Sequence, residues 1–396
     1  MWRDLAPIGR SAESGGYRRY AWTGADADCR AWFKAQAEAR GLAYELDRNG
    51  NQWAWLGDPA AGDAIVTGSH LDSVPDGGAF DGPLGVVSSF AALDELRRRG
   101  LTGLSRPIAV VNFGDEEGAR FGLACVGSRL TAGQLTPAKA RQLRDADGVT
   151  LPQAMERAGY DPDAIGPDPE RLARIGAFVE LHVEQGRALA DTPHPVGVAS
   201  AIWPHGRWRF DFRGEANHAG TTRIDDRRDP MLTYAHTVLA ARQKAELTGA
   251  LATFGKVNVD PGGVNAIASL VSGWLDSRAP DEGTLSTVVT AIERAAIEHG
   301  EGEGVAVQVT QESFTPVVEF AHGLRDRLAA RLGGVPVLPT GAGHDAGILS
   351  ARIPTAMLYV RNPTGVSHSP AEFAGEDDCV AGVTALADVL EDLACQ

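Results

Sequence analysis

The chain has 396 residues, of which 43% are hydrophobic and 22% charged, and its formal net charge is −15. This length allows a large hydrophobic core and predicts two domains. The negative charge argues against nucleic acid or an anionic membrane surface as a partner, and no apolar run approaches the roughly 20 residues of a membrane helix. Four scattered cysteines and an N-terminus without a signal-peptide core predict reduced thiols in a cytoplasmic protein.

The first part of the chain alternates between predicted strands and helices. In chain order these are a helix over 26–41, a hairpin over 42–57, a strand over 64–70, a helix over 85–100, a buried strand over 106–113 and a strand over 176–186. This succession predicts an α/β sheet with parallel members. Acidic residues follow the strands, and open α/β folds bind their ligands at strand carboxyl ends.

The character of the sequence changes after residue 190. Strand, helix, two strands, helix and strand follow, which predicts a compact α+β unit. The earlier pattern resumes from about 315, with a strand over 353–360 and a C-terminal helix. We therefore predict an α/β fold whose mixed-sheet domain, residues 1–190 and 311–396, is interrupted by a smaller α+β domain, residues 191–310. The two crossovers are candidate hinges.

The segment GSHLDSVPDGGAFDGPLGV, residues 68–86, carries one histidine and three aspartates behind an apolar run. In extended chain His70 and Asp72 point the same way, and a metal-bound histidine commonly donates its other N–H to a carboxylate. The Gly-rich turn that follows allows Asp81 to fold back towards His70. A capped turn without a site is the alternative, because Asp and Gly are common turn residues.

Two adjacent carboxylates, Glu116 and Glu117, end the next predicted strand in GDEEGARF. Such neighbours repel each other and lose hydration unless a cation lies near. Successive side chains diverge, so one is able to bind a metal while the other faces a water as a general base. The alternative is a solvated loop with two surface acids.

Two later segments add histidines. Residues 178–186, FVELHVEQG, alternate so that His182 lies on a polar face, and an edge strand with one hydrated side is the alternative. In GVSHSPAEF, the Ser-Pro-Ala-Glu that follows His368 predicts a capped helix start, which leaves His368 itself unexplained.

Together these segments supply carboxylates, three histidines and a spare glutamate. A two-metal site needs about this inventory, with ions roughly 3.5–4 Å apart. Mixed histidine and carboxylate donors suit Zn, Mn, Co or Ni. By contrast His218, Asn265 and Arg278 carry no signal when each is taken alone.

Six segments in this order resemble the amidase/hydantoinase/carbamoylase branch of the M20 metallopeptidase-like family. They are GSHLDSVPDGGAFDGPLGV, GDEEGARF, ELHVEQG, ANHAGTT, GAGHDA and GVSHSPAE, and they extend from residue 68 to about 372. The branch includes N-carbamoyl-L-amino acid hydrolases, allantoate amidohydrolases and β-ureidopropionases. The short separation of His70 and Asp81, with the wording GGxFDGxxGV, is of the carbamoylase type.

The resemblance implies a role for each matching residue. Two divalent metal ions, Zn or Mn and alternatively Co or Ni, would be held by five ligands: His70, Asp81, Glu117, His182 and His368. His70 and His182 would be terminal ligands of different ions, with Glu117 and His368 completing the two sites, and Asp81 would bridge both ions. Glu116 would be the general base for the bridging water, and Asp72 would orient His70 or handle a proton.

The resemblance also implies that the inserted domain is a lid and a dimerisation domain. His218, reaching in from the partner subunit of a homodimer, and Asn265 would stabilise the oxyanion. Arg278 would clamp the substrate carboxylate, as an arginine fork does. Gln185 and His344 would be further substrate contacts.

The expected activity is hydrolysis of the ureido C–N bond of an N-carbamoyl-L-amino acid or an allantoate-like ureido acid. An aminoacylase or dipeptidase of the same family is the nearest alternative, and a metal-free binding protein with this fold is the alternative of another class. The chain departs from the family pattern at Arg223, Arg361 and Asn362. These departures concern the substrate side chain rather than the metal site.

Overall fold

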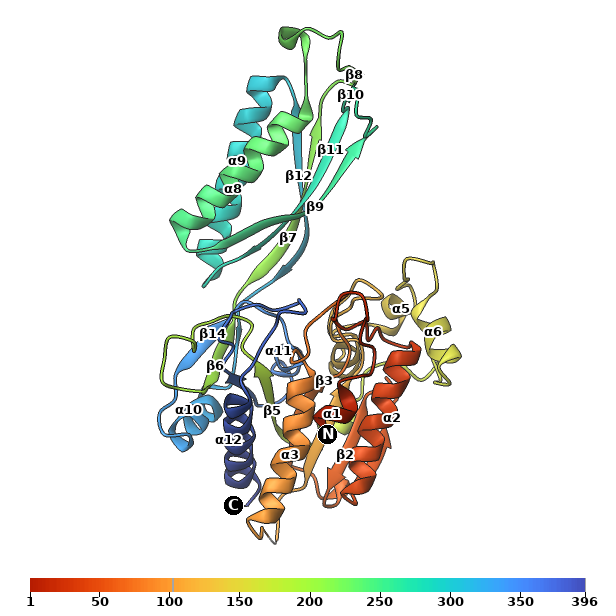
Figure 1. Cartoon of the computed structure of the whole chain (residues 1–396), viewed down its shortest axis with the longest axis vertical. Helices are drawn as coiled ribbons and strands as arrows, with labels where there is room; N and C mark the ends of the chain where they lie inside the picture. The colour runs from red at the N-terminus through yellow and green to blue at the C-terminus, as the bar shows by residue number, and fades with distance from the viewer. Residues whose placement is uncertain (102, 396) are drawn as a thin grey trace. The chain divides into compact units, whose positions relative to one another are not determined.

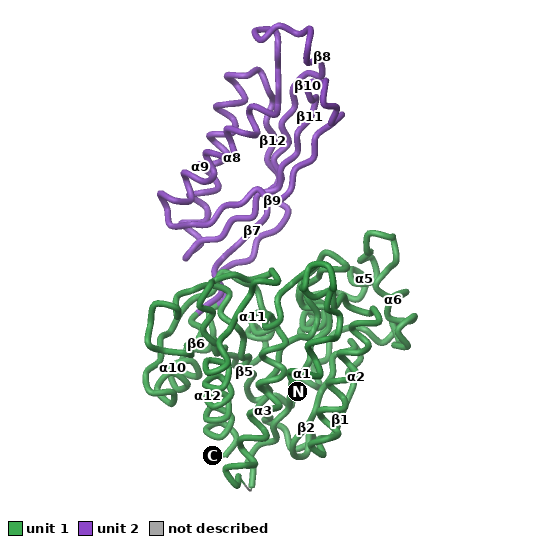
Figure 2. Tube along the Cα trace, in the orientation of Figure 1, with its two compact units in different colours: residues 1–200, 319–396 green, residues 201–318 purple. Residues whose placement is uncertain are grey.

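The computed structural model describes residues 1–101 and 103–395, and the chain divides into two compact units (Figure 2). Unit 1 comprises residues 1–200 and the chain from residue 319 onward, and unit 2 comprises residues 201–318. The insert therefore begins and ends later than the predicted bounds 191 and 310. The reason is that residues 196–198 still pair within the large sheet of unit 1, whereas the last long strand of unit 2 continues to Thr315.

Among the described residues, unit 1 is built on a nine-stranded mixed sheet with the order β1-β2-β4-β3-β5-β15-β6-β13, and β14 pairs with β6. The strands are β1 (Ala43–Leu46), β2 (Gln52–Leu56), β3 (Ala64–His70), β4 (Ile108–Phe113), β5 (Ile175–Val183), β6 (Val196–Ile202), β13 (Val318–Glu319), β14 (Val337–Thr340) and β15 (Thr355–Val360). The antiparallel pair β1–β2 confirms the predicted hairpin.

Four neighbouring strands, β4, β3, β5 and β15, run parallel to one another. Every residue of β3, β4 and β15 is buried, as expected for strands covered on both faces. Strand β5 lies between β3 and β15, and all but one of its residues are buried. The interpretation of this segment as an edge strand with a hydrated side is therefore wrong.

Helices cover both faces of this sheet (Figure 1). On one face α2 (Gly24–Ala39), α3 (Pro83–Arg98) and α12 (Glu376–Ala394) share a core with Val179 and Leu181 of β5. The intervening side chains Glu180 and His182 thus point to the other face, where α11 (Asp345–Leu349) packs against β5 and β15 and beside α4 (Val126–Ala132). The remaining helices of unit 1 are α1 (Trp2–Leu5), η1 (Pro59–Ala61), α5 (Pro137–Ala140), α6 (Leu151–Arg157), α7 (Pro169–Leu172) and α10 (His322–Arg331).

Unit 2 consists of a four-stranded antiparallel sheet, in the order β12-β7-β11-β9, with two helices packed against it (Figure 1). Phe210, Phe212, Val288 and Ile292 lie in the core between them. A separate two-stranded ribbon joins β8 to β10. The elements are β7 (His205–Arg213), β8 (Asn217–His218), η2 (Ile224–Asp226), α8 (Pro230–Thr248), β9 (Leu251–Asp260), β10 (Ala266–Ile267), β11 (Leu270–Arg278), α9 (Glu282–Glu303) and β12 (Ala306–Thr315).

The long helices carry charged residues along their length, as α9 does with Glu293, Arg294 and Glu298. Within residues 1–101 and 103–395, none is both long enough and apolar enough to cross a membrane.

Candidate metal centre

The predicted ligands meet at the carboxyl ends of the four parallel strands of unit 1. His70 is the last residue of β3, Glu116 and Glu117 follow β4, His182 lies at the end of β5, and His368 follows β15. Parallel strands end at a common edge of their sheet, so segments far apart in the sequence converge there.

Asp81 lies between three histidines. Its Oδ1 atom is 3.2 Å from Nε2 of His182 and 3.7 Å from Nε2 of His70. Its Oδ2 atom is 3.4 Å from Nε2 of His368. The two oxygens of one carboxylate thus face different histidines, which is the arrangement that a ligand shared by two ions requires.

The two glutamates approach different histidines of this group. Oε2 of Glu117 is 3.7 Å from Nε2 of His368, whereas Oε2 of Glu116 is 3.6 Å from Nε2 of His70. Among the described residues, four groups of donor atoms lie within 4.8 Å of one another. Two of these clusters share Asp81: one contains His70, Asp81 and His182, and the other contains Asp81, Glu117 and His368. The remaining two are His70 with Glu116 and Glu117, and Glu180 with His182 and His344. His70 and His182 therefore fall in one cluster, whereas the resemblance implied that they are ligands of different ions.

Two of these donor atoms are buried without a hydrogen-bond partner among residues 1–101 and 103–395. They are Nε2 of His70 and Oε1 of Glu117. Nδ1 of His182 lies 2.8 Å from the carbonyl oxygen of Val183, so the neutral ring carries its proton there, and its Nε2 accepts the backbone N–H of Gly82 at 3.2 Å. Unpaired buried polar atoms are costly. Divalent metal ions at the two clusters would satisfy them, and the donor set fits such ions.

Burial and charge alter the titration of the cluster. Burial raises the pKa of Glu116 well above its usual range, with His70 opposing the shift. Burial and the charge of Asp81 raise the pKa of Glu117 to about 8. Burial alone would lower the pKa of His70, but the carboxylates of Glu116 and Asp72 raise it well above its usual range. In the absence of a metal these groups hold protons that a cation would displace.

Asp72 contacts both His70 and the backbone of the two glutamates. Its Oδ1 accepts the backbone N–H of Glu116 at 3.1 Å and its Oδ2 accepts that of Glu117 at 3.0 Å. Oδ1 also lies 3.4 Å from Nδ1 of His70. Gly82, at φ 80°, covers the other side of the imidazole, where an added Cβ would come within 2.4 Å of the ring.

The two predicted substrate contacts of unit 1 both lie beside the cluster. Nε2 of Gln185 donates to Oδ2 of Asp81 at 2.7 Å and to Oγ of Ser367 at 3.1 Å. His344 packs edge-on against His182, with ring centroids 4.5 Å apart. Burial, reinforced by the charge of His182, lowers the pKa of His344 well below its usual range, so this imidazole is neutral.

The predicted capped helix start after His368 is wrong. Residues 369–371 form a turn, and α12 begins only at Glu376. Glu372 instead binds a distant segment, because its Oε1 accepts the N–H of Phe80 at 2.8 Å and that of Asp81 at 2.9 Å. No local pattern indicates this contact, which joins residues almost 300 positions apart.

Cys125 is a second residue near the cluster that no sequence pattern indicates. Its Sγ donates to Oε1 of Glu116 at 3.2 Å. Burial, together with the charge of Glu116, raises the pKa of the Cys125 thiol well above its usual range, so it remains a neutral donor.

Two of the departures from the family pattern have structural partners. Arg361 forms a two-bond ion pair with Asp378 in the first turn of α12, at 2.6 and 3.0 Å. Asn362 stabilises the following turn, because its Oδ1 accepts the N–H of Thr364 and of Gly365. The third departure, Arg223, is exposed on unit 2 with its guanidinium 3.9 Å from Asp226.

The remaining predicted residues belong to unit 2 and lie at two different ends of it. His218 and Asn265 share the β8–β10 ribbon, where the N–H of Ala219 donates to the carbonyl of Asn265 at 2.9 Å. Arg278 ends β11 and forms an ion pair with Asp276 at 2.8 Å. Leu270 begins β11 next to the ribbon, so the full length of that strand separates the two groups within the unit.

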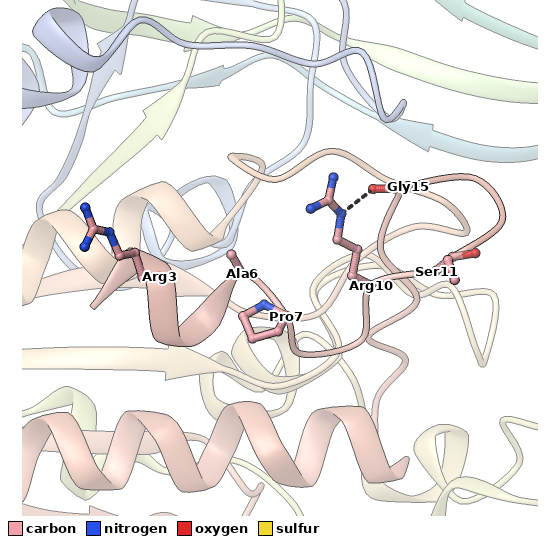
Figure 3. A pocket seen from close by; sticks show the side chains of 7 residues that line it. Arg3, Ala6, Pro7, Arg10, Ser11 and Gly15 are labelled. Atoms are coloured by element: carbon pink, nitrogen blue, oxygen red, sulfur yellow. Dashed lines mark hydrogen bonds between the residues drawn. The ribbon is translucent and has the colours of Figure 1, made fainter.

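A surface hollow of about 580 Å³ lies elsewhere on unit 1 (Figure 3). Seven residues near the N-terminus line it: Arg3, Ala6, Pro7, Arg10, Ser11, Ala12 and Gly15. Arg10 is held there by a hydrogen bond from its Nε to the carbonyl of Gly15 at 3.1 Å. The lining offers no histidine or carboxylate, so this hollow does not resemble the metal cluster in chemistry.

The fold and the site together define a class of protein. Its members have a mixed-sheet α/β unit that carries a histidine and carboxylate cluster at its strand ends, and an α+β unit is inserted into that unit. Within this class the chain belongs to the peptidase family M20/M25/M40, whose family model matches residues 66–392.

Known relatives match almost the whole chain. An N-carbamoyl-L-amino acid amidohydrolase of Geobacillus stearothermophilus is 36% identical, with 100% of this chain and 98% of the relative covered. An allantoate amidohydrolase of Escherichia coli (strain K12) is 32% identical, with 97% and 94% covered. The crystal structure of an amidase of the hydantoinase/carbamoylase family from Burkholderia multivorans has a TM-score of 0.86 and 30% identity, with 100% of this chain and 96% of that chain covered.

Proposed function

We propose that this protein is a two-metal amidohydrolase that cleaves the ureido C–N bond of N-carbamoyl-L-amino acids or allantoate-like ureido acids. The observation that carries the proposal is the convergence of two overlapping donor clusters on Asp81, with Glu116 beside them. The relatives named for hydrolysis of N-carbamoyl-L-amino acids and of allantoate support the substrate class.

Five residues would hold the two divalent ions: His70, Asp81, Glu117, His182 and His368. Zn or Mn suits this mixture of imidazole and carboxylate donors, and Co or Ni is compatible with it. When bound, such ions polarise the substrate carbonyl and make water more acidic. Asp72 positions the imidazole of His70 through Nδ1 and leaves Nε2 free for an ion.

Glu116 is the proposed proton carrier. It is buried, and burial raises its pKa well above the usual range of a glutamate. A carboxyl group with a raised pKa is suited to general acid–base catalysis. In the reaction it would take a proton from the attacking water and deliver it to the leaving nitrogen. Cleavage of a carbamoyl group in this way releases ammonia and leaves a carbamate, which decomposes to carbon dioxide and the free amine.

His218 has the hydrogen-bonding state that an oxyanion donor needs. The N–H of Gly220 donates to its Nδ1 at 3.0 Å, so the neutral ring carries its proton on Nε2. The side chains of His218 and Asn265 are both exposed. They are thus available to a substrate, with Asn265 as a second polar group on the same ribbon.

Arg278 is the proposed partner of the substrate carboxylate, and its place supports a homodimer. The nine residues of β11 between the ribbon end and Arg278 span about 26 Å at the usual rise per residue. That length exceeds an N-carbamoyl amino acid, so one copy of unit 2 does not bring Arg278 and His218 to a single substrate. A second subunit would supply His218 and Asn265, with unit 2 serving as lid and dimerisation domain.

The compartment that we propose is the cytoplasm. All four cysteines are unpaired thiols, and two of them, Cys29 and Cys125, are buried. A reducing compartment keeps such thiols intact.

The deciding experiment measures ammonia release from purified protein loaded with Mn²⁺ or Zn²⁺. The substrate panel contains several N-carbamoyl-L-amino acids, allantoate and dipeptides, with metal content determined on the same samples. We expect ammonia from at least one ureido acid and no cleavage of dipeptides. Cleavage of dipeptides or N-acyl amino acids alone would assign the protein to the aminoacylase and dipeptidase branch instead.

A further inference from the structure

The loop that carries Asp81 needs a support beyond Gly77. Between His70 and Asp81 the chain has no helix or strand, and its backbone pairs with Tyr17 at Gly77, directly before a second glycine at 78. Glycines give a chain many accessible conformations. A carboxylate that serves two ions must nevertheless hold its backbone within a narrow range.

Glu372 supplies the missing contact. A single oxygen, Oε1, accepts the N–H of Phe80 and the N–H of Asp81, at 2.8 and 2.9 Å. The side chain is only 5% exposed. A buried polar group that loses its hydrogen-bond partner is costly to the folded state, so these two bonds to one buried oxygen restrict the backbone at Phe80 and Asp81.

Gly78 closes the other side of the Glu372 carboxylate. An added Cβ at Gly78 would lie 2.4 Å from Oε1 of Glu372 and 2.5 Å from its Cδ. The carboxylate is therefore enclosed between the Gly78 backbone and the two N–H groups that it accepts. Any side chain at position 78 would displace it.

The same contact links two ligands from opposite ends of the chain. Glu372 lies four residues after His368, and Oδ2 of Asp81 is 3.4 Å from Nε2 of His368. Ser367 adds a second link, because its Oγ donates to Oδ2 of Asp81 at 3.2 Å. Residues 78–82 and 367–372 thus form one assembly. Within residues 1–101 and 103–395, Glu372 is the one residue whose side chain accepts the backbone N–H of Asp81.

We propose that Glu372 is a positioning residue for the metal centre, which sets the Asp81 backbone relative to His368 and thereby controls affinity for the ion that those two residues share. This inference rests on the proposed function. It makes no use of Glu372 as a ligand or as a proton carrier.

Three variants test it: Glu372→Ala, Glu372→Gln and Gly78→Ala. The matched control is Asp145→Ala, because Oδ1 of Asp145 accepts the N–H of Asp147 and of Val149 in the same manner, in a loop without proposed ligands. Hydrogen exchange of the peptide covering residues 78–82 is followed in metal-free protein. Metal affinity is measured separately by competition with a chromophoric chelator.

For Glu372→Ala we expect at least about tenfold faster exchange at residues 80 and 81 and about 10- to 100-fold weaker binding of one of two metal equivalents. Gly78→Ala should reproduce both effects from the other segment. Glu372→Gln keeps an acceptor oxygen and should restore affinity to within about threefold of the unsubstituted protein. Asp145→Ala should change neither the hydrogen exchange of residues 78–82 nor the metal affinity.

Two results would overturn the inference. One is unchanged exchange and unchanged metal affinity in Glu372→Ala, and the other is an equal loss in Glu372→Gln and Glu372→Ala. If the unsubstituted protein itself binds no metal, the proposed function fails, but exchange in the metal-free variants still reports on the Asp81 loop. The two failures are therefore distinguishable.

Discussion

Glu116 and Glu117 are neighbours in the chain with different surroundings. Glu116 faces the thiol of Cys125 and the imidazole of His70, whereas Glu117 faces His368. The difference follows from the divergence of successive side chains at the end of β4, with Asp72 fixing both backbone N–H groups. The difference is compatible with the two proposed roles, Glu117 as a metal ligand and Glu116 as the proton carrier.

The substitution Glu116→Gln should separate metal binding from turnover. Glutamine preserves the shape of the side chain but does not accept a proton at neutral pH, so we expect kcat to fall about 100- to 10,000-fold. Metal content, measured by elemental analysis, should remain that of the unsubstituted protein. Glu156→Gln makes the same chemical change on the exposed surface of α6 and should have full activity. A near-normal rate for Glu116→Gln would show that another group is the base.

Metal binding should release protons. Glu117 has an ordinary pKa of 4.5 but a folded-state pKa of about 8, and the pKa of His70 is also raised. At pH values between these two pKa values, Glu117 is protonated in the folded metal-free protein but ionised in the unfolded chain. The contribution of Glu117 to the free energy of unfolding therefore falls as the pH rises from about 5 to 8. The affinity of the folded protein for a cation increases over the same pH range.

Calorimetry tests this expectation directly. Titration of Zn²⁺ or Mn²⁺ into metal-free protein at pH 6.5, in two buffers of different ionisation enthalpy, should give different apparent enthalpies. Glu117→Gln should release fewer protons per ion bound. Identical enthalpies in the two buffers would contradict the raised pKa values.

At the scale of secondary structure, α12 is anchored beside the segment that leads to His368. The guanidinium of Arg361 makes two bonds to Asp378, and the side chains are 27% and 12% exposed. Asp378 also occupies the first turn of the helix, where a carboxylate is favourable. The pair therefore has a stabilising role that requires no substrate.

We expect Arg361→Ala to lower the free energy of unfolding by about 1 kcal/mol and to leave the ranking of substrates unchanged. Urea denaturation and the ureido-acid panel measure the two effects. Arg98→Ala, which removes an arginine that is 74% exposed and paired with Glu95, should change neither. A changed substrate ranking with unaltered stability would instead assign Arg361 to the substrate pocket.

The elements of this fold could be predicted largely from local patterns. The strand over 64–70 has the predicted bounds. The hairpin, α3 and α12 lie where the apolar periodicity and the glycines at turns and helix ends indicate. Because parallel strands end at a common edge of their sheet, it could also be predicted that His70, His182 and the two glutamates lie close together.

Interactions between distant segments could not be predicted in this way. The Ser-Pro-Ala-Glu pattern after His368 satisfies every local condition for a capped helix, yet Glu372 binds the backbone of Phe80 and Asp81 instead. Two bonds from a buried carboxylate outweigh a helix cap, which contributes about 1 kcal/mol. Similarly, the alternation of polar and apolar residues in β5 is also the pattern of a strand with one hydrated face. The polar side chains Glu180 and His182 are instead buried, by partners from distant segments that the sequence does not indicate.

At the scale of the whole molecule, unit 2 distributes its candidate residues between two ends. His218 and Asn265 lie on the β8–β10 ribbon, and Arg278 lies at the far end of β11. This separation predicts that a complete site combines Arg278 of one subunit with His218 of another. Two inactive variants, Glu116→Gln and His218→Ala, should then complement each other.

Co-expression with two different affinity tags isolates the mixed dimer. If His218 acts across the interface, the subunit with His218→Ala keeps its own Glu116 and receives His218 from its partner, so the dimer has one complete site and about half of normal activity. If His218 acts within its own subunit, neither site is complete and the mixed dimer is inactive. The control dimer pairs an unsubstituted subunit with one that carries both substitutions. Its outcome is reversed, because action across the interface leaves it inactive whereas action within a subunit leaves about half of normal activity, so the two dimers together decide which subunit supplies His218.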